Sequence, residues 1–403
     1  MSLCSTWLRR RSVSALADWR SSVPVHPLRK SLIAAVHPLA AGVAQFNGAL
    51  ARAMAQHGPV DVISWRRLYP PLLYRGQVLD PSSPHHDGPE AAFILDWHDP
   101  RSWHRAARRV AEFDADVLIL PWLHPVMTPP YRYLLRHVPR STSRVVICHN
   151  VKPHEAVAGL RALSRATLRH AELIVTHAPH QRGEVAALGL ASIPLLEAFH
   201  PRFAADDFGP VPTASERAAE RARYGDPDLL LLAFGSIRPY KGIDIALDAL
   251  ARVDPSLYAR LVVAGRSWDG GDALRAQAAR LGLEGRVDFL DRFISNEEAA
   301  LLFSAADASL LPYRSASQSG VVQLSFAYER PVIATRVGGL PAAVDDDVTG
   351  VLCEPDPDSV ARAIERMADA HTELGDGVRA TTHTTSFERY TALLDDAFVG
   401  LRS

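Results

Sequence analysis

Two cations lie three positions apart in one short loop of the sequence, Arg238 and Lys241 in the stretch GSIRPYKG. The loop opens at Gly235 and directly follows an apolar run, LLLLAF at 229–234, of the kind that forms a buried strand. Arginine can donate two parallel hydrogen bonds to phosphate oxygens, and lysine adds a compact point charge. A buried strand that ends in such a loop predicts an anion site, although a solvated turn would have the same composition.

A second anion site is predicted at the start of a helix that follows another strand. In RSASQSGVVQ, residues 314–323, Ser319 and Gly320 come just before an apolar, helix-forming run. A helix start presents free amide groups and about half a positive charge, and a glycine there lets a phosphate approach the backbone. Either loop alone is as well explained by turn geometry. Both together, at strand ends of one sheet, would form a cage for a diphosphate.

In the first half of the chain two residues occupy comparable positions. Gly42 separates a predicted strand from the first helix, where a glycine admits a phosphate or a sugar. His149 ends the strand RVVICHN, 144–150, and His124 ends an earlier strand. A histidine at a strand end is more often hydrogen-bonded within the core, so His149, which Asn150 follows, is the better functional candidate of the two.

These loops need a scaffold in which strands alternate with helices. The apolar runs lie at 31–36, 60–65, 116–120, 144–150, 171–178, 229–234, 260–265, 287–290, 308–313, 331–335 and 350–354. Helical patterns separate them, and two helix starts are marked by Ser295 with Glu298 and by Asp358. This alternation is typical of parallel, doubly wound sheets, whose ligands bind beyond the carboxyl ends of the strands.

Two α/β domains that face each other across a cleft are expected from 403 residues. The expected parts are a basic arm at 1–30, a first Rossmann-like domain at 31–205, a linker region at 206–228, a second Rossmann-like domain at 229–385, and a C-terminal helix at 386–403 that crosses back to the first domain. The linker is expected because 203–228 is rich in proline, charge and small residues.

Composition argues against several classes of protein. Lysine plus arginine (44) nearly equals aspartate plus glutamate (45), so a broad nucleic-acid-binding face is not expected. The three cysteines, Cys4, Cys148 and Cys353, match neither a disulfide framework nor zinc ligands, which fits a reducing cytoplasm. No His-Glu-x-x-His motif indicates a metal, and no apolar run reaches the roughly 18 residues that a membrane span needs.

The first thirty residues differ from the rest of the chain. They carry six basic residues against one acid, with Trp7 and Trp19 between them. One interpretation is an arm that touches anionic lipid at the inner membrane face. The other is an extension without a function, or a start codon placed too early.

The motifs of the second half together resemble those of the family 4 glycosyltransferases, in a variant with SQSG. The likeness is densest in FGSIRPYKGIDIALDAL, VVAGRS, DFLDRFISNEEAALLFSAADASLLPYRSASQSGVVQ and PVIATRVGGLPAAVDDDVTGVLCEPD, and looser in AGVAQFNGALARAMA, ICHNVKPHE and AELIVTHA. It covers roughly residues 31–400. The resemblance implies the GT-B fold and transfer of a sugar from a nucleotide diphosphate donor, with the anomeric configuration retained and no metal or other cofactor required.

The resemblance also implies roles for single residues. Arg238 and Lys241 match the cations that neutralise the donor diphosphate, and His149 matches a histidine that contacts the donor sugar. The donor-binding positions that the motifs match are Gly42, Gly235, Ser319, Gly320 and Val321. Beside Gly42, Ala41 stands where a second glycine is usual.

Three further positions depart from the family pattern. Many members carry two glutamates eight positions apart, and here Ala316 and Leu324 occupy those positions. Gln318 and Gln323 lie close by, and their amide oxygens can accept the same hydrogen bonds with less energy. Glu329 stands where a glycine commonly ends the helix.

The sequence therefore predicts a retaining, metal-independent glycosyltransferase of the cytoplasm. Its acceptor is a sugar, a lipid-linked molecule or a small molecule, and 66–90 is expected to form part of the acceptor wall. A sugar-nucleotide epimerase of the same architecture is one alternative, but it would need acids in the cleft that the sequence does not identify. A non-catalytic binder of nucleotide-sugar or glycan is the other, and the missing glutamates keep it open.

Overall fold

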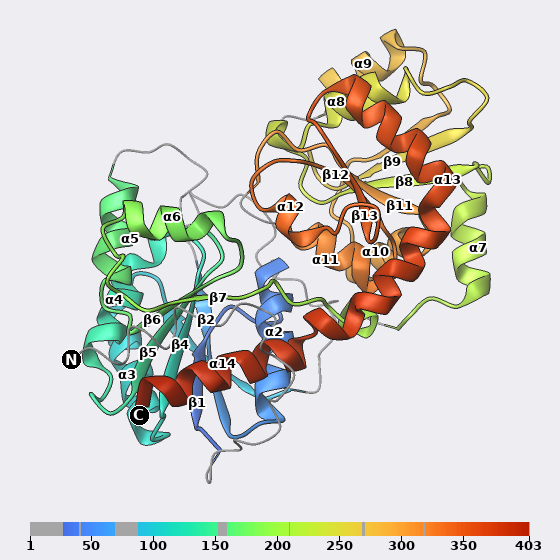
Figure 1. The fold of residues 1–403 in the computed structure, drawn as a ribbon. Coiled ribbons are helices and arrows are strands. Elements are labelled where there is room, and N and C mark those ends of the chain that lie inside the picture. The colour runs from blue at the N-terminus through green and yellow to red at the C-terminus, as the bar shows by residue number, and fades with distance from the viewer. Residues whose placement is uncertain are drawn as a thin grey trace. The chain divides into compact units, whose positions relative to one another are not determined.

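The computed structural model describes residues 27–39, 42–68, 88–151, 159–208, 210–267, 271–316 and 319–402. These residues form two compact units, each built on its own parallel sheet (Figure 1). Unit 1 holds the described residues up to Ala198 together with those from Tyr390 onward, and unit 2 holds Phe199–Arg389. The expected fold class, α/β with two Rossmann-like domains, is confirmed.

Unit 1 contains a seven-stranded sheet in the order β3-β2-β1-β4-β5-β6-β7, in which every neighbouring pair is parallel. Its strands are β1 (Lys30–Ile33), β2 (Val60–Arg67), β3 (Ala91–Asp96), β4 (Val117–Trp122), β5 (Ser143–Cys148), β6 (Leu173–Thr176) and β7 (Leu195–Glu197). Its helices are α2 (Gly42–Ala55), α3 (Pro100–Glu112), α4 (Thr128–His137), α5 (Leu160–Leu168), α6 (His180–Ala187), a 3-10 turn η3 (Pro125–Met127) and most of α14 (Phe387–Arg402). The strand order reverses between β1 and β4, and the carboxyl ends of such a pair are where these sheets bind ligands.

The start of β1 is fixed within unit 1 by two basic residues. The fully buried Lys30 forms an ion pair of 2.9 Å with Asp395 of α14. Arg29 donates from its guanidinium to the carbonyl of Phe113 at 2.6 and 2.8 Å. Both residues therefore belong to the folded unit, whereas the sequence suggested an arm that reaches residue 30.

Unit 2 contains a six-stranded parallel sheet in the order β10-β9-β8-β11-β12-β13. Its strands are β8 (Leu229–Phe234), β9 (Ala259–Ala264), β10 (Val287–Leu290), β11 (Ala308–Leu311), β12 (Val332–Thr335) and β13 (Gly350–Cys353). Its helices are α7 (Ala214–Ala222), α8 (Ile243–Leu250), α9 (Asp272–Arg280), α10 (Asn296–Ala305), α11 (Gly320–Ala327), α12 (Leu340–Ala343) and α13 (Pro357–Thr381), with 3-10 turns η4 (Ala205–Phe208), η5 (Pro239–Lys241) and η6 (Thr382–Thr385). Here the strand order reverses between β8 and β11.

The segment expected to be a linker, 206–228, forms part of unit 2. Thr213 and Glu216 close a capping box at the start of α7, which satisfies two amide groups of the first turn. An ion pair of 2.9 Å between Arg221 of α7 and Asp307 then holds this helix beside the start of β11. The motif TASE at 213–216 carries this capping box, but the high charge of the segment led to the prediction of a linker.

Two of the predicted helix caps differ in detail from the observed ones. Ser295 accepts from the amide of Glu298 at 3.2 Å, as predicted. The Glu298 carboxylate, however, pairs with Arg292. Asp356 rather than Asp358 caps α13, because Pro357 suits the first helical position, which has no use for an amide donor.

Glu329 ends α11 in the left-handed conformation, with φ of +59°, where glycine would be unstrained. Its carboxylate accepts from Arg379 at 2.9 Å, and both side chains are about half exposed. Glu329→Gly and Glu329→Ala lose this ion pair equally, but only glycine relieves the backbone. We expect the glycine variant to have a free energy of unfolding about 1 kcal/mol above that of the alanine variant. Urea denaturation measures the difference, and equal stabilities would contradict the expectation.

Candidate functional site

In unit 2 the strand order reverses between β8 and β11, and we call this place the switch point of the sheet. The loops that follow these two strands contain the predicted anion-binding residues. Gly235, Arg238 and Lys241 follow β8, and the loop after β11 leads to Ser319 at the start of α11. Because β8 and β11 are neighbouring parallel strands, their carboxyl ends lie at the same edge of the sheet. The structure thus brings this part of the predicted site together.

Lys241 is buried, with 7% of its surface exposed. Its Nζ donates to the carbonyl of Phe234 at 2.7 Å and lies 5.5 Å from the centre of the Tyr313 ring. Burial lowers the pKa of Lys241 to about 8, an effect that Tyr240 opposes and Arg238 reinforces. A buried ammonium without a carboxylate contact of its own gains much from a bound anion.

The backbone of this loop leaves little freedom to its residues. Gly235 has a φ of +93°, which would strain any other residue, and a Cβ there would also lie 2.9 Å from Nζ of Lys241 and displace it. Gly242, at φ of +64°, approaches so closely that a Cβ would lie 2.0 Å from the carbonyl oxygen of Pro312. Arg238 is extended and comes just before the 3-10 turn η5. Gly242 therefore lets the end of this loop lie against Pro312 in the loop after β11, and the missing side chain of Gly235 leaves room for Nζ of Lys241.

Arg314 connects the same two loops. Its amide donates to the carbonyl of Tyr240 at 2.7 Å, and its guanidinium donates to the carbonyl of Pro239 at 3.0 Å. The guanidinium also forms two hydrogen bonds with the carboxylate of Asp244 in the first turn of α8. These bonds lower the pKa of Asp244, so the pair stays ionised at neutral pH. Arg314 fixes the cation loop from outside.

Replacing Arg314 with lysine should weaken nucleoside diphosphate binding about tenfold, because lysine cannot bond Asp244 in two places and Pro239 at once. Calorimetric titration of UDP or whichever diphosphate binds measures the effect. Arg260→Lys is the matched control, since Arg260 bonds Asp288 in two places at the amino-terminal part of β9. Unchanged affinity in Arg314→Lys, or an equal loss in the control, would contradict a positioning role.

The side chain of Ser319 caps the amino terminus of α11. The Ser319 hydroxyl accepts from the amide of Val321 at 3.3 Å, which is a long hydrogen bond. A phosphate at this helix start would have to share or replace that bond, which sequence analysis did not anticipate. At Gly320 an added Cβ would meet nothing within 4 Å, so the backbone there is open to approach. Gln323 is buried in the first turn, with 4% exposed, and Gln318 lies outside the described residues.

Ala316 and Leu324, which stand at the positions of the two common glutamates, have structural roles. The carbonyl of Ala316 accepts from the amide of Gly339 at 3.2 Å. It lies so close to Gly338 that a Cβ on that glycine would be 1.4 Å away. The Gly338–Gly339 turn after β12 thus supports the loop after β11. Leu324 is buried, with 7% exposed.

The predicted residues of the first domain, Gly42 and His149, belong to unit 1. Gly42 begins α2, after β1 at the switch point of this sheet. The side chain of Asn47, one turn later and fully buried, donates to the carbonyl of Ala35 at 2.8 Å. This bond ties α2 to the chain that leaves β1.

His149 follows β5 and is buried, with 4% exposed. Its carbonyl accepts from Nε2 of Gln181, whose Oε1 accepts from the amides of His177 and Ala178. The ring of Phe46 packs edge-on against the His149 ring, with centroids 4.6 Å apart. One glutamine of α6 thus joins the ends of β5 and β6.

His177 extends this buried cluster to the C-terminal helix. Its Nε2 lies 2.8 Å from the hydroxyl of Tyr390, which is fully buried. The rings of His149 and His177 lie 5.4 Å apart. His124, the other candidate at a strand end, instead accepts from the amide of Val126 through Nδ1 and caps η3, a structural role.

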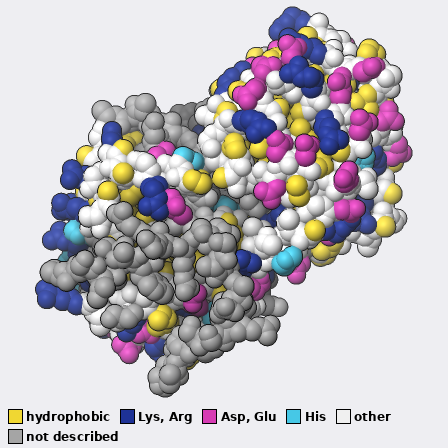
Figure 2. Space-filling view, in the orientation of Figure 1, with side chains coloured by type: hydrophobic (Ala, Val, Ile, Leu, Met, Phe, Trp, Pro, Cys, Tyr) yellow, Lys and Arg dark blue, Asp and Glu magenta, His cyan; other side chains and the backbone are white. Residues whose placement is uncertain are grey.

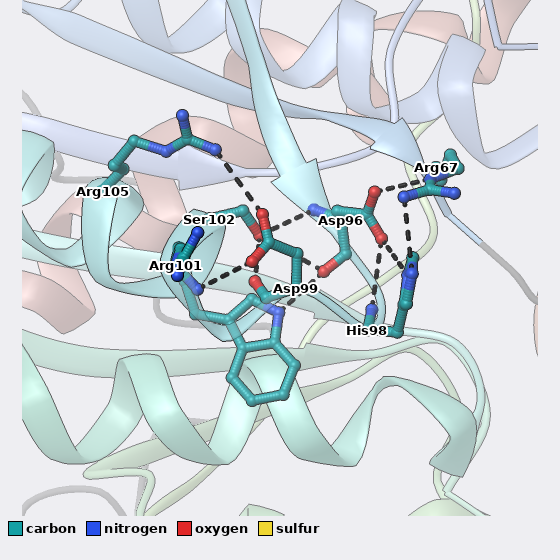
Figure 3. A network of polar contacts seen from close by, with 8 residues as sticks. Arg67, Asp96, His98, Asp99, Arg101, Ser102 and Arg105 are labelled. Carbon is teal, nitrogen blue, oxygen red and sulfur yellow. Dashed lines mark hydrogen bonds and ion pairs between the residues drawn. The ribbon is translucent and has the colours of Figure 1, made fainter.

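A second polar network of unit 1 lies at the carboxyl ends of β2 and β3 (Figure 3). The buried Asp96 accepts from Nε of Arg67 and contacts Nδ1 of His98, both at 2.6 Å. Burial alone would raise the pKa of Asp96, but hydrogen bonds from Arg67 and His98 lower it overall. A nearby hollow of about 690 Å³ is lined by Asp99, Pro100, Arg101, His104, Arg105 and Tyr133. Much of 66–90, the expected acceptor wall, lies outside the described residues.

The described residues contain neither a group that could hold a metal ion nor a helix that could span a membrane. No group of three or more histidine, cysteine, aspartate or glutamate side chains among them is arranged to hold a metal ion. No helix within the described ranges is long and apolar enough to cross a bilayer. The two described cysteines, Cys148 and Cys353, are buried and not disulfide-bonded.

Sequence reasoning missed several residues that shape these sites. Tyr313 and Arg314 come two and three positions after the end of β11, so their place near a strand end was a usable signal. Gln181 offered a weaker signal, as a polar residue soon after β6. Tyr390 offered none, because 213 positions separate it from His177.

Comparison with known proteins relates part of unit 2 to one family and both units to one fold. Residues 228–370 match the family model described as glycosyl transferases group 1. HepE of Anabaena in complex with UDP and glucose has a TM-score of 0.69 at 18% identity and covers 92% of this chain and 98% of its own. A glycosyltransferase of Rickettsia africae has a TM-score of 0.70 at 12% identity and covers 93% and 99%. At these identities the likeness establishes the fold, which is GT-B.

Curated relatives with higher identity cover less of the chain. A D-inositol 3-phosphate glycosyltransferase of Streptomyces griseus is 38% identical over 231 residues, or 49% of this chain and 48% of that protein. One from Mycobacterium tuberculosis is 36% identical over 188 residues, or 45% and 38%. The chain thus spans about half or less of the length of these relatives.

Proposed function

We propose that this protein is a glycosyltransferase that moves a sugar from a nucleotide diphosphate donor to an acceptor, with retention of anomeric configuration and without a metal. The observation that carries the proposal is the pair Arg238 and Lys241 at the switch point of unit 2, within the segment that matches group 1 glycosyltransferases. Lys241 is buried and its pKa is lowered, so it is prepared to bind an anion.

The reaction places charge where these cations lie. The bond between the anomeric carbon and the β-phosphate oxygen breaks, and both electrons remain on the phosphate. A bond from the acceptor oxygen to the anomeric carbon forms on the same face, and the acceptor proton passes to the departing phosphate. Cations fixed in advance stabilise this developing charge more than they stabilise the bound donor.

The other predicted residues have supporting roles in this proposal. His149 contacts the donor sugar, and Gly42 leaves space beside the donor and the acceptor. Gly235, Ser319, Gly320 and Val321 shape the diphosphate site, with backbone amides of the helix start facing the phosphates. Gln323 or Gln318 replaces the acid that bonds the nucleotide ribose in related enzymes.

The partners follow from the same reasoning. The donor is a nucleotide diphosphate sugar, and the acceptor is a sugar, a lipid-linked molecule or a small molecule. UDP is the first nucleotide to test because HepE binds it, and an inositol phosphate is the first acceptor to test because the relatives are named for one. We place the protein in the cytoplasm, where its cysteines would stay reduced, with contact to the inner membrane face through the N-terminal arm as a further part of the proposal.

A metal-free thermal-shift and calorimetric screen against UDP, GDP, ADP and TDP tests the donor site. We expect one nucleotide to raise the melting temperature of the wild type and to have no such effect on Arg238→Ala. Stabilisation that persists in Arg238→Ala would remove this arginine from the site. No stabilisation by any of the four would contradict the donor-binding proposal as a whole.

A non-catalytic binding protein is the second candidate. It is favoured by one observation, which is that Ala316 and Leu324 occupy the positions of the two common glutamates. Gln323→Leu separates the possibilities in part, because it should weaken nucleotide binding if Gln323 serves the ribose. Nucleotide binding without release of nucleoside diphosphate from any donor, over a panel of acceptors, would favour the binding protein.

A further inference from the structure

Helices α4 and α5 of unit 1, and the starts of the strands that follow them, are rich in arginine. Within 128–151 and 159–172 the only acid is Glu172, although the whole chain has a net charge of -1. Figure 2 shows Lys and Arg side chains along the edge of unit 1 where Figure 1 places α3, α4 and α5. The arginines of these two ranges are Arg132, Arg136, Arg140, Arg144, Arg161, Arg165 and Arg169.

His170 stands between α5 and β6, at the amino-terminal edge of the sheet, and arginines of three elements lie near it. Arg169 directly precedes it and caps the end of α5. Arg132 and Arg136 are four positions apart on α4, which contacts α5. Burial lowers the pKa of His170, and Arg169, Arg136, Arg132 and Arg144 lower it further, in that order. We call these four arginines and His170 the His170 cluster.

Glu172 neutralises only one member of the cluster. The guanidinium of Arg144 donates to the Glu172 carboxylate at 2.7 Å, and the amide of Arg144 donates to it at 3.1 Å. The carbonyl of Arg144 accepts from the amide of Glu172 at 2.8 Å, so this acid is directed to Arg144. Among the described residues, no acid forms an ion pair with Arg132, Arg136 or Arg169. Three arginines of the cluster thus keep their full charge.

The ends of α4 and α5 offset only part of this charge. Each helix presents about half a negative charge at its carboxyl end, which stabilises a nearby cation. Two helix ends therefore supply about one negative charge against three unpaired arginines, and an excess of about two positive charges remains. Like charges four positions apart on a helix, as Arg132 and Arg136 are, destabilise it. The excess matches one phosphate monoester, which carries about two negative charges at neutral pH.

Three nitrogen atoms of the cluster are buried and have no hydrogen-bond partner among the described residues. They are Nε of Arg132, Nε of Arg144 and Nε2 of His170. A buried donor without an acceptor destabilises a fold, whereas a phosphate offers charged oxygen acceptors to several donors at once. Nε2 of His170 becomes a donor when the ring is protonated, and a bound anion favours that form. The cluster therefore has donors and charge for an oxyanion.

We propose that the His170 cluster binds the phosphate group of a small anion, either inorganic phosphate or a soluble phosphomonoester. Arg132, Arg144 and His170 are only partly exposed, whereas Arg136 and Arg169 are exposed. A small anion can contact both sets of side chains. A flat bilayer or a nucleic acid would meet mainly the two exposed arginines, so the burial of the other three favours the small anion.

This phosphate site is separate from the predicted site residues of unit 1. Arg144 lies near the start of β5, and His149 directly follows the end of the same strand. Five residues of extended chain, at about 3.3 Å per residue, separate them by roughly 16 Å. The two residues thus lie at opposite ends of the strand, and the phosphate site does not depend on the proposed glycosyltransferase activity.

NMR spectroscopy of the full chain with isotope-labelled histidine tests the proposal, because the ring signal of His170 reports on this site and not on the donor site. His170→Gln identifies the signal by its absence. We expect inorganic phosphate, added at constant pH and ionic strength, to shift this signal along a saturating curve. Chloride under the same conditions should leave the signal in place. A titration with glycerol phosphate compares a soluble phosphomonoester with the free ion.

Two double variants make the titration specific. Arg136→Gln, Arg169→Gln should raise the dissociation constant of phosphate about a hundredfold, because one hydrogen bond to a charged group is worth about tenfold or more in affinity. Arg136→Gln alone should raise it about tenfold. Arg280→Gln, Arg362→Gln removes the same charge from exposed helix positions of unit 2 and should leave the constant unchanged. Circular dichroism like that of the wild type confirms that each variant is folded.

The outcomes separate the explanations. Equal dissociation constants in the wild type and in Arg136→Gln, Arg169→Gln would overturn the proposal, as would a shift of equal size with chloride. A His170 signal that moves with vesicles containing phosphatidic acid, but with neither inorganic phosphate nor glycerol phosphate, would assign the charge to a lipid headgroup and overturn the small-anion site. A signal that moves only with poly(U) RNA would make the cluster a nucleic-acid surface instead.

Discussion

Lys241→Met is expected to lower the rate of sugar transfer at least a hundredfold, the largest effect that we predict for a single substitution. Methionine keeps most of the buried volume but removes the charge that would face the departing phosphate. The loss of one preorganised donor to a developing anion costs about 10²–10³ in rate. Steady-state release of nucleoside diphosphate, measured with the donor that the nucleotide screen identifies, gives the number.

The stability of this variant should change little. Removing a buried ammonium eliminates a desolvation cost, while the carbonyl of Phe234 loses the donor that now lies 2.7 Å away. The two effects oppose each other, so we expect a melting temperature close to that of the wild type. Activity lost without loss of stability would assign the role of Lys241 to chemistry or donor binding.

Two companion variants make the result specific. Arg238→Ala should produce a loss of similar size, because both cations would face the same diphosphate. Arg336→Met removes a cation after the neighbouring strand β12, but Arg336 is already paired with Asp346, so its activity should stay near that of the wild type. Full activity in Lys241→Met and Arg238→Ala would exclude the proposed diphosphate site.

Much of the scaffold could be predicted from sequence because buried parallel strands have a simple signature. The run LLLLAF is apolar throughout, RVVICHN has four consecutive apolar residues, and both form strands with buried residues. The strands β3 and β7 were missed; β7 has only three residues, and both are edge strands in which most residues are partly exposed. Such strands take their structure from the neighbour with which they pair.

The candidate site was predictable only where chemistry and position coincide. Lys241 is a cation at a strand end, and this pattern is visible without coordinates. Arg314 and Asp244 stabilise the same loop, but their contact joins positions 70 apart. Tyr390 reaches His177 only because α14 belongs to unit 1, which no local pattern indicates. Long-range positioning contacts follow from the tertiary fold, so they could not be predicted from local sequence.

The burial of Lys241 also predicts how nucleotide binding depends on pH. Its pKa in the free protein is about 8, whereas a bound diphosphate favours the protonated ammonium. Above pH 8 the free protein must take up a proton to bind, so affinity should fall by up to tenfold for each pH unit. Burial raises the pKa of the adjacent Tyr313 to about 12, so this phenol does not titrate in the same range.

Over the same pH range the free energy of unfolding should rise, whereas nucleotide affinity falls. In the unfolded chain Lys241 keeps its proton up to its usual pKa near 10.5, so between pH 8 and 10.5 the unfolded state binds more protons than the folded one. The contribution of this residue to the free energy of unfolding therefore rises with pH while nucleotide affinity falls. Calorimetry at pH 8.5 in buffers of different ionisation enthalpy should show proton uptake on binding, and Lys241→Met should abolish it. Lys241 is the only buried amine of this loop, so it alone can make nucleotide affinity fall and the free energy of unfolding rise with pH. Nucleotide affinity that stays constant up to pH 9.5 in the wild type would therefore mean that Lys241 does not contact the nucleotide.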